Sequence, residues 1–406
     1  MTATSASAHP FSHPAFRLFW IARTLSSLAF QMAAVALGWL IYDRTHSAAS
    51  LGFVGLAQFA PQIVLTFLVG HVADRYDRRT IVTICQAVQA CAVLVLTLGI
   101  LGGWLHIAGI YGVIAVFGGA RAFEQPTASA LLPGTVPAVI LPRAVAVSST
   151  AMQTASIIGP ALGGLLYGLG PVVPFACAAI GFAAASASIS AMRLERVPPR
   201  KETATLASVF SGLHFIRERP IVLGTISLDL VAVLLGGATA LLPIYARDIL
   251  HTGPWGLGLL RLAPALGALA MGIAMSVVPL QRHVGMKMFS AVLVFGLATL
   301  VFAFSTNVAL SVAALVVLGA ADNISVVIRN SLVQLLTPQE MLGRVSAVNS
   351  LFIGTSNQLG EFESGMTAAL LGAVPAAAIG GLGTIAVVLL WMRLFPALRR
   401  ADRFAE

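Results

Sequence analysis

The chemistry that this sequence offers lies in charged residues placed inside long apolar stretches. Five are acids and four are arginines: Glu124, Asp229, Asp322, Glu361 and Glu363, with Arg23, Arg121, Arg261 and Arg329. A charge at membrane depth is costly, so it normally faces a cavity or an opposite charge. Burial favours the protonated form of a carboxyl group, whereas a nearby arginine favours its charged form. These residues therefore indicate either proton exchange or permanent ion pairs between helices.

Glu124 and Asp229 are the strongest candidates to carry a proton. Glu124 follows Arg121 by three residues, so the two share a helix face and can pair. Asp229 is the more isolated by sequence. We hypothesise that one of these acids carries a coupling proton. The alternative is that each acid neutralises an arginine and holds helices together, and Arg23 can also reach the inner interface by snorkelling.

The segments that must hold these residues are predicted to be membrane-spanning helices. Of 406 residues, 58% are hydrophobic and only 10% are charged, against about 25% charged in soluble domains. One span needs about 20 apolar residues. Apolar runs predict twelve spans, at 17–41, 50–70, 80–102, 108–132, 144–167, 171–192, 220–245, 255–279, 287–305, 309–333, 345–371 and 373–395. The expected fold class is an all-α membrane protein.

The distribution of positive charge predicts the orientation. Of the 24 Lys and Arg residues, 18 fall at alternate ends of the spans and only Arg44 and Arg247 fall on the other side. Lys and Arg are retained in the cytoplasm, so both termini are predicted to be cytoplasmic. This bias explains the net charge of +9 without a nucleic-acid partner.

Depth follows from the rise of about 1.5 Å per residue in a helix. Asp229 and Glu124 are expected near the middle of the membrane. Asp322 and Arg329 are expected in the cytoplasmic half of the second set of spans, and Arg261, Glu361 and Glu363 in its outer half.

Two halves of six spans are predicted, with a linker between them. Gly119-Ala120 recurs as Gly319-Ala320, and Arg143 recurs as Arg344, each about 200 residues later. Residues 1–192 and 220–406 are thus expected to form two pseudo-symmetric six-helix bundles. Residues 193–219 are expected to form a cytoplasmic linker with an amphipathic helix, because Leu206, Val209, Phe210, Leu213 and Ile216 recur at helical spacing.

The loop Gly70–Arg79 resembles the signature cytoplasmic loop of the major facilitator superfamily. The matching residues are Gly70, Asp74, Arg75, Arg78 and Arg79; Asp77 stands where the family has glycine, and we expect it to tolerate a left-handed turn. The resemblance implies twelve helices and alternating-access transport. It also implies that Asp74 meets the start of the eleventh span at Arg344 when the cytoplasmic side closes. The alternative is that these charges only anchor the loops in the cytoplasm.

A second motif, Gly159-Pro160-Ala161-Leu162-Gly163-Gly164, resembles the fifth-span motif of the antiporters of the superfamily. Small residues permit close helix packing and proline bends the helix. The resemblance favours export over uptake. Ordinary packing glycines are the alternative.

Short stretches narrow the resemblance to a branch. Phe16–Trp20, Asp322–Val326, Gly343–Asn349 and Ser356–Gly365 resemble the bacterial transmembrane secretion effectors, the branch that includes the enterobactin exporter. This resemblance implies a proton-coupled exporter of a small amphipathic compound, siderophore-like or drug-like, in the bacterial inner membrane.

Other function classes explain less of the sequence. A channel would need filter motifs, an enzyme would need a compact catalytic cluster, and the eight histidines are scattered. Cys85, Cys91 and Cys177 lie in apolar runs without metal-site spacing. We therefore expect no cofactor or metal, a proton gradient as the energy source, lipid and a small molecule as partners, and a monomer. Uptake or facilitated diffusion of a metabolite remains the alternative.

Overall fold

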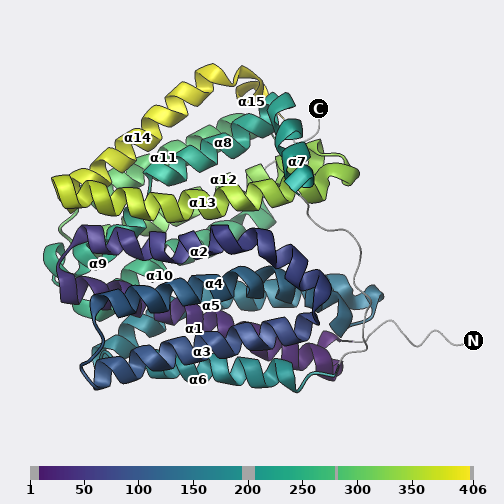
Figure 1. The fold of residues 1–406 in the computed structure, drawn as a ribbon. Helices are drawn as coiled ribbons and strands as arrows, with labels where there is room; N and C mark the ends of the chain where they lie inside the picture. Colours follow the sequence, from purple (N-terminus) through teal and green to yellow (C-terminus); the bar gives the residue numbers. More distant parts are fainter. Residues whose placement is uncertain (1–8, 194–205, 279–281, 403–406) are drawn as a thin grey trace, which may run out of the picture. The chain divides into compact units, whose positions relative to one another are not determined.

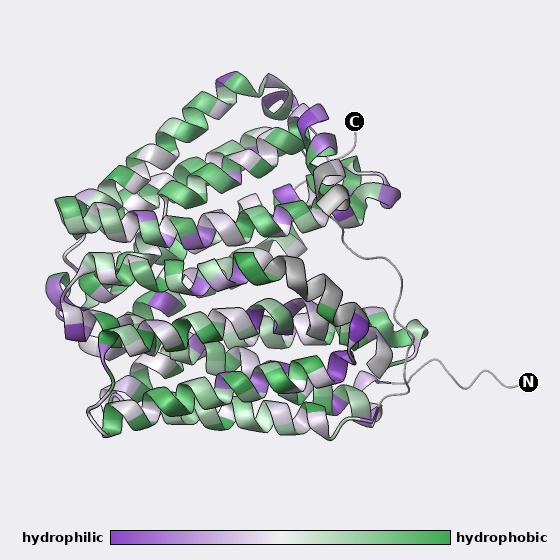
Figure 2. Ribbon diagram, in the orientation of Figure 1, coloured by the Kyte–Doolittle hydropathy of each residue, from purple (hydrophilic) through white to green (hydrophobic). Residues whose placement is uncertain are grey.

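Long helices account for most of the fold, which is known from a computed structural model (Figure 1). The structure describes residues 9–193, 206–278 and 282–402, except for the side chains of residues 66–71, 73, 74 and 206–210. No strand occurs in these ranges. Figure 2 shows apolar residues along the helices and hydrophilic residues concentrated toward their ends.

The chain divides into two compact units. Unit 1 comprises residues 1–40 and 57–203, and unit 2 comprises residues 41–56 and 204–406. The turn between the first two helices thus groups with unit 2. The predicted boundaries of the two bundles and the linker stay predictions.

The first six long helices correspond to the first six predicted spans, with ends that differ by a few residues. They are α1 (Pro14–Thr45), α2 (Ala48–Arg75), α3 (Arg78–Leu101), α4 (Ile107–Leu131), α5 (Leu141–Leu169) and α6 (Val173–Ser190). Three short 3-10 turns flank them: η1 (Pro10–Ser12), η2 (Leu132–Thr135) and η3 (Ala138–Ile140).

The later helices begin with α7 (Leu206–Glu218) in the predicted linker. The remaining elements are α8 (Pro220–Leu235), η4 (Ala238–Leu241), α9 (Leu242–Ile244), η5 (Tyr245–Ile249), α10 (Gly253–Val277), α11 (Val284–Phe304), α12 (Val308–Leu336), α13 (Gln339–Leu371), α14 (Ala373–Leu394) and α15 (Pro396–Arg400). Ile216 of α7 is fully buried in a cluster with Val345 and Val348, so this helix packs on the start of α13.

Ten helical segments of the described chain are long and apolar enough to cross a membrane. The two remaining long helices, α5 and α13, are more polar. Helix α5 carries a run of Ser, Thr and Gln between positions 148 and 156, and α13 carries Glu361, Glu363 and two asparagines. Polar spans of this kind must be shielded from lipid by other helices.

The seventh predicted span, 220–245, is not one continuous helix as predicted. It breaks after Leu235 at Gly236-Gly237, continues through η4 and α9, and ends in the π-helical turn η5. A Cβ atom on Gly237 would lie 2.5 Å from the Gly360 carbonyl oxygen and from Ser364 Oγ. Helix α13 thus crosses against the break, and protein packing permits non-helical backbone at this depth.

Each unit contains a close helix crossing near a glycine of the predicted repeat. In unit 2, a Cβ atom on Gly319 of α12 would collide with the Pro264 carbonyl oxygen of α10, whereas in unit 1 Gly119 of α4 meets only the side chains of Leu65 and Pro61. The close backbone approach of unit 1 falls one residue earlier, where a Cβ atom on Gly118 would collide with the Gln58 carbonyl oxygen of α2. The internal repeat stays a prediction.

The Gly-Pro motif of α5 packs on α1. A Cβ atom on Gly159 would lie 2.5 Å from Gln31 Cβ, and one on Gly163 would lie 2.7 Å from the Met32 carbonyl oxygen. Pro160 and Gly164 are also buried. In unit 2, Gly360 of α13 approaches the Leu234 carbonyl group of α8 in the same manner, at 2.9 Å from its Cβ position.

Candidate functional site

Unit 1 contains a buried carboxylate surrounded by hydrogen-bond donors. Glu124 of α4 is 2% exposed. Its Oε1 accepts hydrogen bonds from Ser26 Oγ of α1 at 2.6 Å and Gln86 Nε2 of α3 at 3.0 Å. Its Oε2 accepts one from Gln89 Nε2 at 2.7 Å. Three helices therefore converge on one carboxylate.

Two arginines of unit 1 interact with the charge of Glu124. Arg121 and Arg23 are both close enough for an electrostatic interaction with it. However, no ion pair within 4 Å joins Glu124 to an arginine in the described chain, so the predicted Arg121–Glu124 pair is an interaction at longer range. The guanidinium of Arg121 instead lies 3.6 Å from the Phe30 ring centroid, a cation–π contact.

These contacts leave unit 1 with an excess of positive charge around Glu124. Arg23 donates to the sulfur of Met152 at 3.0 Å and has no carboxylate within 4 Å in the described chain. Two positively charged arginines thus interact with a single negatively charged carboxylate. An anionic group of a bound compound would reduce that imbalance.

In unit 2, Asp229 is not isolated as its place in the sequence suggested. Asp229 of α8 forms an ion pair with Arg329 of α12, and their side chains are 7% and 4% exposed. The partner escaped prediction because it comes from a distant helix. The only sequence signal was that both positions were charged within apolar runs.

A small cavity lies beside this ion pair. Its volume is about 10 Å³, which is near the minimum for one water molecule, and its lining includes Asp229, Asp322 and Ser325. Asp322 has no cationic side chain within 4 Å among the described residues. Asp322, rather than Asp229, is therefore the acid of this group without an arginine at ion-pair distance.

The predicted outer-half charges also lie in unit 2. Arg261 of α10 and Glu361 of α13 are close enough for their charges to interact. Glu363 accepts a hydrogen bond from Thr367 Oγ1 at 2.8 Å on its own helix. The carboxylate of Glu363 is therefore hydrogen-bonded within its own helix.

The signature loop is described only in part. Gly70 and the side chain of Asp74 lie outside the described side chains, so the predicted contact between Asp74 and Arg344 stays a prediction. Arg344 of α13 donates to Ser211 Oγ of α7 at 3.3 Å.

The basic residues of the loop tie it to helix ends in unit 1. Arg79 donates to the carbonyl oxygen of Ser190 at the end of α6, and Arg78 donates to that of Ala130 near the end of α4, at 3.2 Å. Arg75 is exposed. A cation at a helix C-terminus is favourable. The expected left-handed turn at Asp77 is wrong, because its φ of −60° is ordinary for the residue before a helix.

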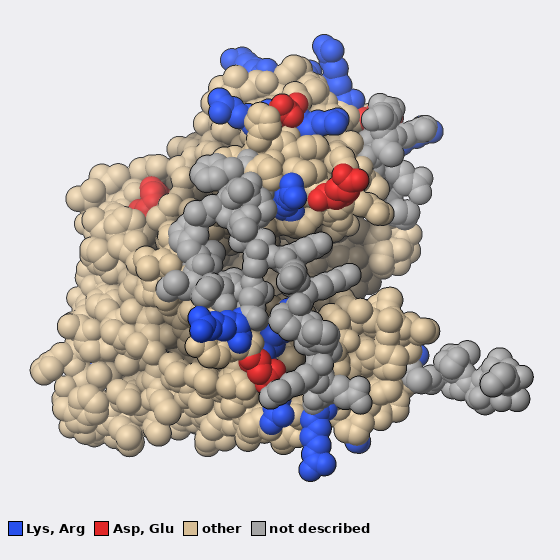
Figure 3. All heavy atoms as spheres, turned by 45° about the vertical axis from the view of Figure 1, so that its right-hand side comes forward, with Lys and Arg blue, Asp and Glu red and all other residues tan. Residues whose placement is uncertain are grey.

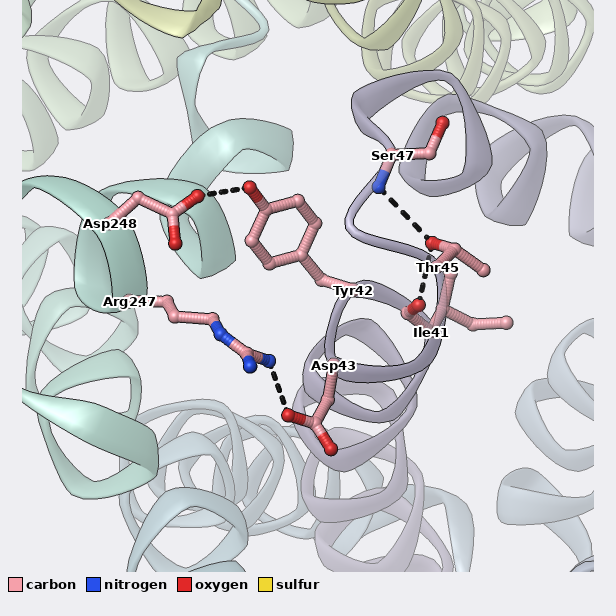
Figure 4. Close-up of polar contacts among 7 residues, drawn as sticks. All are labelled: Ile41, Tyr42, Asp43, Thr45, Ser47, Arg247 and Asp248. Carbon is pink, nitrogen blue, oxygen red and sulfur yellow. Dashed lines mark hydrogen bonds and ion pairs between the residues drawn. The ribbon is translucent and has the colours of Figure 1, made fainter.

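Sequence reasoning missed a polar cluster at the α1–α2 turn, which belongs to unit 2 (Figure 4). Tyr42 donates a hydrogen bond to Asp248, and Asp43 forms an ion pair with Arg247. Arg247 and Asp248 both lie in η5. Nearby, Gly52 of α2 and Gly365 of α13 cross so closely that a Cβ atom on Gly365 would lie 2.5 Å from Gly52 Cα. Only the structure shows that a π-helical turn contributes to this polar cluster, and such turns frequently occur at functional sites.

No group of three or more His, Cys, Asp and Glu residues in the described chain is arranged to hold a metal ion. The arrangement of acids, amides and arginines inside apolar helices suits the binding and release of protons or of a charged solute instead.

The family model of transmembrane secretion effectors matches residues 4–405. The chain belongs to this family. Its fold is that of the major facilitator superfamily, and it is a multi-pass membrane transporter rather than an enzyme.

Two relatives that this chain matches are enterobactin exporters named EntS. The protein from Citrobacter koseri is 28% identical over 398 residues, which cover 96% of this chain and 94% of the relative. The protein from Escherichia coli strain 55989 is 26% identical over 398 residues, with the same shares of the two chains.

Solved structures confirm the fold of this chain. A bacterial homologue of the iron transporter ferroportin, in an inward-facing state, matches with a TM-score of 0.73 at 16% identity, over 95% of this chain and 98% of that one. A bacterial homologue of the human lysosomal transporter Spinster matches with a TM-score of 0.72 at 12% identity, over 97% of both chains.

We expect reversal of one charge at the α1–α2 turn to impair transport, and reversal of both to restore it. Arg247→Asp places two acids together, and adding Asp43→Arg re-forms the pair. The side chains of Arg247 and Asp43 are 29% and 46% exposed, so the pair contributes only about 0–1 kcal/mol to stability. Transport rate and thermal stability should be measured together. Equal transport by the single and double variants would contradict a role for the pair.

Proposed function

We propose that this protein is a proton-coupled exporter of a small amphipathic compound, siderophore-like or drug-like, in the bacterial inner membrane with both termini cytoplasmic. The observation that carries the proposal is Glu124, a carboxylate buried among apolar helices that accepts three hydrogen bonds and interacts with the charges of two arginines. These contacts favour the charged form of Glu124, so its protonation would accompany a rearrangement that breaks some of them. The names of the enterobactin exporters favour a siderophore as cargo.

The positive-inside rule supports the orientation. Figure 3 shows exposed Lys and Arg side chains, and Arg75, Arg399 and Arg400 lie in the last turns of their helices. Retention of these charges in the cytoplasm would place those helix ends inside the cell. A tag can be placed at either terminus and probed in intact cells. A tag that becomes accessible only after the membrane is permeabilised would support a cytoplasmic terminus.

The cluster in unit 1 suits exchange of a proton for an anion. When Glu124 is charged, it offsets one of the two arginines that act on it. When Glu124 is protonated, Arg23 and Arg121 are left with more positive charge and attract an anionic group more strongly. Loading of a proton and of an anionic amphipathic compound would then be linked.

Transport by purified protein in sealed vesicles tests this function. An imposed pH gradient should drive enterobactin, or an antibiotic, in the direction opposite to the proton flow. An uncoupler should abolish accumulation against a gradient. Equal rates with and without the pH gradient would support facilitated diffusion, the alternative reading, and transport along the proton flow would support uptake.

In unit 2, Asp322 becomes the preferred proton carrier. It borders a cavity near the minimum size for a water molecule, together with Ser325, whose buried hydroxyl has no partner in the described chain. Asp229 remains a candidate, but its arginine partner stabilises its charged form.

We expect Asp322→Asn to reduce proton-driven transport by about ten-fold or more while leaving the protein folded. The amide fills the same space but does not exchange a proton, and no ion pair of the described chain is broken. Thr384→Ser, a buried conservative change on α14, serves as the control for altered packing. Proton-driven transport by Asp322→Asn at the wild-type rate would assign coupling in unit 2 to another group.

A further inference from the structure

A groove of about 400 Å³ runs between α10, α11 and α12 of unit 2, and it shares Ala321 with the small cavity beside the Asp229–Arg329 ion pair. Its volume lies within the range of about 300–1,000 Å³ typical of ligand pockets. Helix α11 contributes one face, with Lys287, Ser290, Ala291 and Val294 at helical spacing. Every other lining side chain is apolar, including those of Ala320 and Ile324 of α12.

Lys287 gives the groove a cationic end. It lies in the first turn of α11 and is half-buried. No acidic side chain lies within 4 Å of its ammonium group in the described parts of the chain. The acid near this helix end, Asp402, is engaged by His283 through its ring, at 3.7 Å, and its backbone N–H, at 3.0 Å.

The depth of the lining residues fits a lipid molecule. Val294 lies seven residues beyond Lys287, which places it about 10 Å deeper along the helix. A cation thus stands near the end of a membrane-spanning helix, and an apolar channel continues from it toward the membrane interior. In a phospholipid, the phosphate group likewise lies near the membrane surface and the acyl chain extends toward the membrane interior.

We propose that this groove binds one anionic phospholipid. Its phosphate pairs with Lys287, and one acyl chain lies along Ala291, Val294 and Ala320. Basic pockets between transmembrane helices bind anionic headgroups in this manner. A zwitterionic lipid fits less well, because its own cation competes with Lys287 for the phosphate.

Native mass spectrometry of the full-length protein in detergent tests the proposal, with phosphatidylglycerol and phosphatidylcholine of identical chains as probes. Wild-type protein is expected to bind phosphatidylglycerol about five-fold more tightly, since one lysine near the surface contributes about that factor. Lys287→Gln should remove this preference and Lys287→Arg should keep it. Val294→Trp should weaken binding by filling the groove, whereas Arg399→Gln, at an exposed cation on α15, should change nothing.

Three outcomes would overturn the assignment. The first is equal affinity for the two lipids, and the second is an unchanged preference in Lys287→Gln. The third is displacement of phosphatidylglycerol by an exported compound one for one, which would make the groove a substrate site. If Lys287→Gln does not fold, Val294→Trp still tests the site, because unchanged binding of phosphatidylglycerol by Val294→Trp would place the lipid outside the groove.

Discussion

We expect Arg329→Gln to lower the free energy of unfolding by about 3–5 kcal/mol, the largest effect on stability of any single change considered. The change leaves Asp229 as a buried charge without its partner, and such a charge is far more costly than an absent pair. Thermal or denaturant unfolding of the purified protein in one detergent measures the loss. Arg247→Gln is the matched control, because that arginine is more exposed and its loss should cost less than about 1 kcal/mol.

The double variant distinguishes this mechanism from a general loss of packing. In Asp229→Asn with Arg329→Gln, neither charge remains, so most of the lost stability should return. Additive losses from the two single changes would contradict the ion-pair explanation. The same comparison separates a structural role of Asp229 from proton transfer, because the double variant should be stable even where transport is absent.

The largest expected effect on function is that of Glu124→Gln, which should slow proton-driven transport by about 100-fold or more. The carboxylate accepts from Ser26, Gln86 and Gln89, whereas a glutamine offers one acceptor oxygen and an NH₂ group that donates. The glutamine also lacks the negative charge that acts on Arg121 and Arg23. Its amide does not bind a proton near neutral pH.

Sealed vesicles with an imposed pH gradient provide the measurement, and exchange of labelled substrate without a gradient provides the reference. Glu124→Asp keeps an ionisable group and should retain part of the driven transport. Glu340→Gln, at an exposed acid in the first turn of α13, should behave as wild type. An unchanged ratio of driven transport to exchange in Glu124→Gln would refute its role in coupling.

The positions of the long helices followed from the sequence because apolar length is a local property. Every predicted span overlaps a helix, and close helix crossings occur at Gly319 and at Gly118, the residue before Gly119. Small residues mark such crossings directly, since a larger side chain would collide with the neighbouring backbone. The break at Gly236-Gly237 was missed, although the glycine pair was a signal, because the crossing of α13 lies far away in the sequence.

For the charged residues inside the apolar helices, the sequence predicted their positions but not their partners. Their charge was visible in the sequence, and their cost at membrane depth marked them as candidate functional groups. Their partners were not visible, because α8 meets α12, and α1 meets α3 and α4, only after the chain has folded. The tertiary structure therefore decided that Asp229 has an arginine partner, that Asp322 has none at ion-pair distance in the described chain, and that Glu124 is held by two glutamines and a serine.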